Sequence, residues 1–107
     1  MSYTINYYSE ALQAEIMSLP DTLQARYIGL TARMMANGAN LGSPHTEAFG
    51  DGLFELRLKG TEGIARVFYC TLVGRQIVML HCFVKKTQKT PVNERRIAEK
   101  RMKEVKK

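Results

Sequence analysis

The 107-residue sequence has few of the residues that build disulfide frameworks and structural metal sites. It contains two cysteines, two histidines, three prolines and no tryptophan. Two cysteines cannot form a disulfide framework, and a zinc site would need all four Cys and His side chains to converge from spacings unlike those of zinc motifs. We therefore expect no metal and no cofactor, and cysteines that pack as small apolar side chains. These residues are Cys70, Cys82, His45 and His81.

Long apolar runs are also missing. No segment approaches the roughly 18 consecutive apolar residues of a membrane span, and residues 1–8 lack the basic leader and apolar core of a signal peptide. The glycine-rich residues 38–52 lack the Gly-Lys-Ser/Thr ending of a phosphate-binding loop. We expect a soluble, cytoplasmic protein. With 45% apolar and 24% charged residues, it should fold as a single domain over residues 1–107.

Charge is distributed unevenly along the chain. The formal net charge is +6, of which residues 1–50 contribute −2 and residues 51–107 contribute +8. Residues 85–107 alone hold ten Lys or Arg against three glutamates. Like charges at this density repel one another unless a polyanion or an acidic protein binds them, and we favour nucleic acid because phosphate contacts give affinity through counterion release. A solvated basic helix that only aids solubility is the alternative.

The first part of the sequence predicts one strand followed by two helices. Residues 3–8 are rich in β-branched and aromatic side chains, which favour a strand. Ser9 can cap a first helix that ends at Pro20. A second helix then begins with the capping-box pattern of Asp21 and Gln24. This helix should end at the Asn37-Gly38 pair. Its buried apolar stripe is expected at Leu23, Tyr27, Leu30 and Met34.

The second half predicts an antiparallel meander and a terminal helix. Residues 38–52 contain four glycines and are assigned to a long loop. Thr90 as N-cap and Pro91 at the first helical position predict a basic helix at the chain end. The fold class is α+β, with the helices on one face of an antiparallel sheet of about four strands. The meander strands are expected at residues 54–60, 64–70 and 76–86.

Alternation along these strands predicts a cationic cluster on the sheet. Glu55, Arg57 and Lys59 share one strand face, and Arg66 joins them from the neighbouring strand. His81 should point to the same side, although a core histidine is an equal alternative. We expect this cluster, with Glu55 as its one carboxylate, to meet at one end of the sheet and to need a bound polyanion. Its cations are Arg57, Lys59, Arg66, Lys85, Lys86 and Lys89.

Such a cluster is suited to cleaving RNA. An RNA 2′-hydroxyl attacks its own adjacent phosphate when a base takes its proton, cations stabilise the dianionic transition state and an acid protonates the leaving 5′ oxygen. No metal is required. The candidates are Arg57 and Arg66 as phosphate clamp, Glu55 or His81 as base, and Lys85 or Lys86 as proton donor or electrostatic stabiliser. Further RNA contacts are expected from Lys59, Lys89, Thr90, Arg95 and Arg96.

Three motifs resemble a known family. The segments LFELRLKG, ARVFY and LHCFVKKTQKTP, the last running into a basic helix, resemble the phage-derived HigB branch of the RelE/ParE toxin superfamily. This resemblance implies the toxin of a type II toxin–antitoxin pair, a metal-independent endoribonuclease that cuts mRNA in the ribosomal A site. It implies a HigA-like helix-turn-helix antitoxin as partner, through which operator DNA is contacted indirectly. The positions that match the family are Arg57, Lys59, Arg66, His81 and the Lys85-Lys86 pair.

Two other functions stay open at this stage. One is a non-catalytic module that binds RNA or DNA with the same basic face. The other is a gyrase-inhibiting toxin of the same superfamily, which keeps the fold without the strand cations. The presence of Arg57, Arg66 and Lys86 argues against the gyrase inhibitor.

Overall fold

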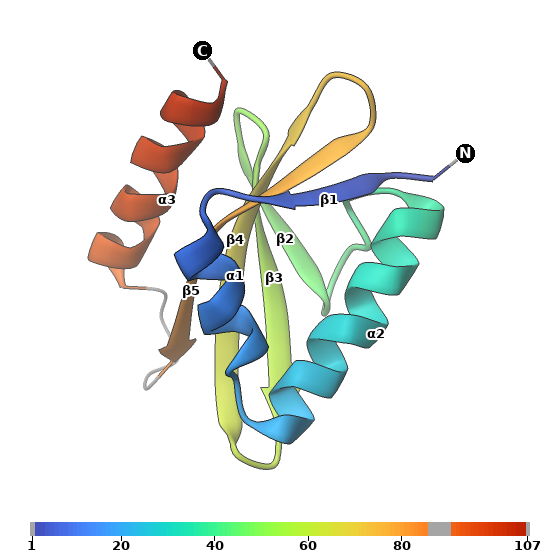
Figure 1. Ribbon diagram of the computed structural model, residues 1–107, viewed down its shortest axis with the longest axis vertical. Coiled ribbons are helices and arrows are strands. Elements are labelled where there is room, and N and C mark those ends of the chain that lie inside the picture. Colours follow the sequence, from blue (N-terminus) through green and yellow to red (C-terminus); the bar gives the residue numbers. More distant parts are fainter. Residues whose placement is uncertain (1, 86–90, 107) are drawn as a thin grey trace.

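Five strands and three helices form the described part of the chain, residues 2–85 and 91–106, in the computed structural model (Figure 1). The α+β class is as predicted. None of the described helices has the length and apolar character needed to cross a membrane. The elements, in order, are β1 (Thr4–Tyr7), α1 (Glu10–Met17), α2 (Asp21–Asn37), β2 (Thr46–Gly50), β3 (Leu53–Gly60), β4 (Gly63–Leu72), β5 (Gln76–Lys85) and α3 (Val92–Val105).

The sheet has the strand order β1-β5-β4-β3-β2. Strands β3, β4 and β5 form the predicted antiparallel meander. The expected four antiparallel strands are wrong in two respects, because β1 pairs parallel with β5 and β2 adds a fifth strand beside β3. Strand β2 lies within the segment assigned to a loop. There Gly50 and Gly52 adopt positive φ angles of 91° and 85° in the tight β2–β3 turn, so the glycines mark a hairpin rather than a long loop.

The helix ends agree only partly with the sequence signals. Ser9 caps α1 as predicted, since its hydroxyl accepts the Leu12 backbone N–H at 3.1 Å. The capping box of α2 is wrong, because Pro20 occupies the cap position and Asp21 is already helical. Gly38, with φ 111°, ends α2 as expected.

Helix α3 begins one residue later than predicted. Pro91 is its N-cap and not its first helical residue, and Thr90 lies outside the described residues. The first turn carries Glu94, as the positive end of a helix dipole favours.

Both faces of the sheet are covered by helices. On one face, α1 and α2 pack residues such as Ile16 and Leu23 against Leu56 and Val67. The expectation that all helices lie on one face is wrong, because α3 covers the opposite face with Ala98 and Met102. That second face is apolar in the middle of β4 and β5, so it needs a cover of its own. Its buried strand residues are Leu53, Phe68, Cys70, Val78 and Leu80.

The two cysteines are buried, as predicted, in different layers of this core. Cys82 packs on the α1–α2 side and Cys70 on the α3 side. Burial raises the pKa of the Cys82 thiol to about 12 and also raises that of Cys70. Both thiols therefore remain protonated at neutral pH and act as packing groups.

Candidate active site

Two arginines face each other across strands β3 and β4. Arg57 and Arg66 are register partners, and the Nε atom of each lies near the same oxygen of Glu55, at 3.6 Å and 3.5 Å. Like charges placed directly opposite destabilise a strand pair. The Glu55 carboxylate, whose side chain is 1% exposed, offsets this repulsion by its charge, although neither Nε atom forms a hydrogen bond within the described chain.

A second carboxylate belongs to the cluster. Glu47 on β2 accepts a hydrogen bond from Arg57 Nη2 at 2.5 Å. The expectation of one carboxylate is therefore wrong, because Glu47 lies in a strand that the glycine-rich sequence around it does not predict. Within the described chain the cluster still holds more cations than carboxylates, since Lys59 and Lys85 accompany the two arginines.

Lys85 reaches the same end of the sheet through the register of β5. It pairs with Ile64, which in turn lies opposite Lys59 on β3. Burial lowers the pKa of the Lys85 ammonium, and the positive charges of Arg66 and Arg57 lower it further against the opposing effect of Glu55. The predicted convergence is therefore observed for Arg57, Arg66 and Lys85. Lys86 and Lys89 lie outside the described residues.

The arginine pair forms a wall of a cavity of about 340 Å³, which we call the site cavity. Two lining residues, Arg26 and His45, were not predicted. His45 is held in place because its carbonyl accepts the Arg57 backbone N–H at 2.8 Å, beyond the end of the β2–β3 pairing. No sequence pattern places either residue, since one depends on the packing of α2 and the other on an irregular loop. The lining residues are Arg26, Pro44, His45, Arg57, Lys59, Ile64 and Arg66.

His81 lies apart from this cavity. Its side chain is on the same face of the sheet as Arg66, as predicted, and it stacks on Phe83 with ring centroids 6.0 Å apart. Phe83, the register partner of Arg66, separates the two. The Nε2 atom of His81 is 2.8 Å from Glu94 of α3, and its Nδ1 is buried without a hydrogen-bond partner among the described residues.

The remaining predicted RNA contacts on α3 form a separate surface. Arg95 pairs with Glu99 at 3.4 Å and lies over the Phe49 ring at 4.6 Å. Arg95 and Arg96 line a different cavity of about 330 Å³ and do not join the site cavity. Within residues 2–85 and 91–106, no three His, Cys, Asp or Glu side chains lie close enough together to hold a metal ion.

Comparisons with known proteins agree with this architecture. Residues 14–103 match the model of the family described as phage derived protein Gp49-like. No curated protein matches the chain significantly. The free-state structure of a double arginine-to-alanine mutant of the E. coli toxin RelE matches with a TM-score of 0.65, covering 98% of this chain and 99% of that chain. The sequence identity is 9%, so this match shows a shared fold.

Proposed function

This chain belongs to the phage-derived Gp49-like family. From this membership and the RelE-like fold, we propose that it is a toxin of the RelE superfamily that cuts mRNA on the ribosome. The observation that carries the proposal is the Arg57–Arg66 pair, which lies beside the Glu55 carboxylate on the wall of a cavity that His45 also lines. This arrangement suits a phosphodiester, because guanidinium groups bind phosphate through two parallel hydrogen bonds.

The proposed reaction is attack of a ribose 2′-oxygen on the adjacent phosphorus. The new P–O2′ bond forms as the P–O5′ bond breaks, which yields a 2′,3′-cyclic phosphate and a 5′-hydroxyl. Arg57 and Arg66 stabilise the dianionic transition state. Lys85, whose pKa is lowered, does not line the site cavity but lies at the same end of the sheet, and in this scheme it would protonate the leaving 5′ oxygen or stabilise its charge. No metal takes part in this scheme.

We assign the general base to His45. His45 lines the site cavity with both arginines, and histidine is the side chain most often used as a general base. Glu55 and His81 were the candidates from sequence. The burial of Glu55 between two arginines favours a positioning role, and Nε2 of His81 is already engaged by Glu94. Lys59 and Arg26 would bind neighbouring phosphates from the rim.

The partners follow from the proposed class. A HigA-like helix-turn-helix antitoxin would neutralise the protein and would contact operator DNA, and the ribosome would present the mRNA in the cytoplasm. Assignment to the HigB branch is part of the same proposal. A non-catalytic RNA-binding module is the second candidate, favoured by the excess of cations over carboxylates around Arg66.

The proposal is tested with purified protein, mRNA-programmed ribosomes and the same mRNA without ribosomes. We expect cleavage on the ribosome, with 2′,3′-cyclic phosphate and 5′-hydroxyl ends identified by enzymatic end-labelling. Intact mRNA that nevertheless stays bound to the protein would support the non-catalytic module. Products with 3′-hydroxyl and 5′-phosphate ends would reject the proposed chemistry.

His45→Ala should lower the cleavage rate on the order of 100-fold at neutral pH, because the general base is lost. Added imidazole should restore part of the rate in this variant, a recovery that a purely structural defect would not show. His81→Ala is the matched comparison and should cost at least tenfold less. A larger loss of cleavage rate for His81→Ala than for His45→Ala would identify His81 as the general base instead.

A further inference from the structure

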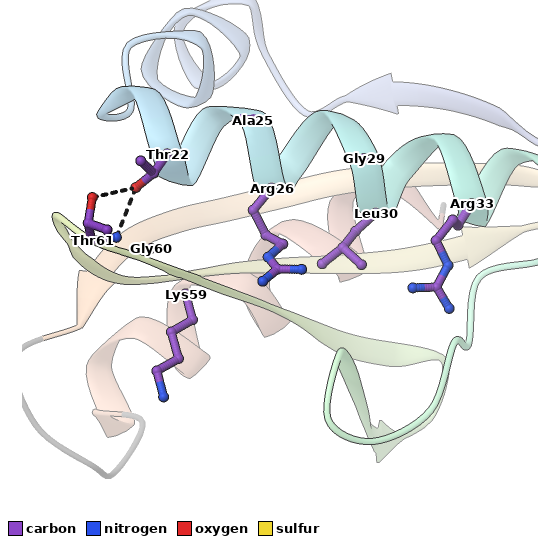
Figure 2. A pocket seen from close by; sticks show the side chains of 9 residues that line it. All are labelled: Thr22, Ala25, Arg26, Gly29, Leu30, Arg33, Lys59, Gly60 and Thr61. Atoms are coloured by element: carbon purple, nitrogen blue, oxygen red, sulfur yellow. Dashed lines mark hydrogen bonds between the residues drawn. The ribbon is translucent and has the colours of Figure 1, made fainter.

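A second groove runs along α2 (Figure 2) and shares two lining residues with the site cavity. This α2 groove has a volume of about 540 Å³ and lies between α2 and the end of β3. Figure 2 shows Arg26, Leu30 and Arg33 projecting from the same side of α2. Arg26 and Lys59 line both the α2 groove and the site cavity, so the two are neighbours. The lining residues that matter here are Ala25, Arg26, Gly29, Leu30, Arg33 and Lys59.

The groove combines three cations with a small apolar floor, in which Ala25 and Gly29 are exposed and Leu30 is buried. Arg26, Arg33 and Lys59 form no ion pair with a carboxylate in the described chain. The two arginines are seven residues apart, which places them about 10.5 Å apart along the helix axis on one flank. Carboxylates at positions i and i+7 of a second helix have the same separation. Phosphates of RNA would use the cations but not the apolar floor.

A stripe of small residues runs along the solvent-facing side of α2, which also exposes Ile28 and Met35. Ala25, Gly29, Ala32 and Ala36 recur at steps of four, three and four residues, and all are exposed. No contact within the protein requires a glycine at position 29, because a Cβ atom added to Gly29 would meet nothing within 4 Å. Glycine inside a helix is destabilising relative to alanine. A face of this kind allows the backbone of another helix to approach closely.

We propose that the α2 groove binds an acidic amphipathic helix of a protein partner. Its apolar side would pack on the exposed Ala25 and Gly29, above the buried Leu30, and its carboxylates would pair with Arg26, Arg33 and Lys59. The naming of this partner as the antitoxin rests on the proposed function, whereas the binding chemistry does not. Because Arg26 and Lys59 also line the site cavity, an occupied groove withholds both from RNA and inhibits cleavage without covering Arg66.

The binding test uses the full chain and a fluorescein-labelled designed helical peptide. The peptide carries glutamates at i and i+7 beside a face of leucine and alanine, and a second version carries glutamines instead. By fluorescence anisotropy we expect Arg33→Glu to weaken binding at least about tenfold, as expected for losing one charge pair and adding a repulsive one. Gly29→Leu should weaken it similarly by filling the floor, without disturbing the fold. Lys100→Glu on α3 makes the same charge change elsewhere and should leave the affinity unchanged.

The alternatives give distinct results. Equal binding of the glutamate and glutamine peptides, or no effect of either groove variant, would overturn the proposal. Weaker binding of a single-stranded RNA oligonucleotide to Arg33→Glu, with unchanged peptide binding, would assign the groove to RNA. In the ribosome assay the peptide should inhibit the parent protein but not Gly29→Leu. A parent protein that binds the peptide yet cuts no mRNA would reject the proposed function alone.

Discussion

Arg66→Gln is expected to lower the rate of mRNA cleavage by about 1,000-fold, which corresponds to about 4 kcal/mol of transition-state stabilisation. Arg66 is the less exposed member of the arginine pair, with 12% of its side chain accessible. A charge held away from water acts on a developing dianion more strongly than an exposed one. Single-turnover cleavage on programmed ribosomes measures the loss. Glutamine keeps much of the side-chain volume, and Arg57 remains beside Glu55 as a neutralising partner.

Arg75→Gln is the control for this substitution. Arg75 lies over the Tyr3 ring in the β4–β5 turn, away from the site cavity, and its loss removes the same charge. It should change the cleavage rate by less than about threefold, the size of a general electrostatic effect on RNA attraction. An Arg66→Gln protein that melts like the parent and cleaves at the control's rate would contradict the assigned role.

Phe68→Ala should lower the free energy of unfolding by about 3–5 kcal/mol. Phe68 is fully buried beneath α3, where it packs against the tilted ring of Phe49 and stacks on Phe83, with ring centroids 5.8 Å and 6.0 Å away. Its removal leaves a cavity where β4 and β5 meet α3. Urea denaturation followed by circular dichroism measures the change.

Val73→Ala provides the comparison for this stability loss. Val73 is 97% exposed in the β4–β5 turn, so the substitution should change the free energy of unfolding by no more than about 0.5 kcal/mol. A loss below about 1 kcal/mol for Phe68→Ala would show that the second core contributes less than its burial implies.

The parts of the fold that could be predicted are those fixed by local periodicity. The alternation of Leu56 and Leu58 with Arg57 assigned both faces of β3, and the α2 stripe was buried as expected. Strand β2 escaped prediction because five residues with exposed Glu47 and Ala48 carry no period-two pattern. Its existence depends on pairing with β3, which is a tertiary interaction. The parallel pairing of β1 with β5 also depends on a tertiary interaction, so no local pattern predicts it.

In the candidate site, too, the residues placed by local strand pairing could be predicted, whereas those placed by a loop or by helix packing could not. The proximity of Arg57 and Arg66 could be predicted from the sequence, because a short turn between two strands determines their register. His45, Glu47 and Arg26 depend on the path of a loop and on where α2 lies beside β3, which no local pattern specifies. The face of His81 was predictable.

The measurement closest to the central claim replaces one ribose at the cut site. An mRNA with a single 2′-deoxynucleotide immediately 5′ to the scissile phosphate would be presented on programmed ribosomes, beside the all-ribose message. If a 2′-oxygen held near His45 attacks a phosphate clamped by Arg57 and Arg66, the substituted message stays intact at that phosphate while the unmodified one is cut. Cleavage of both messages at the same position and rate would contradict the account.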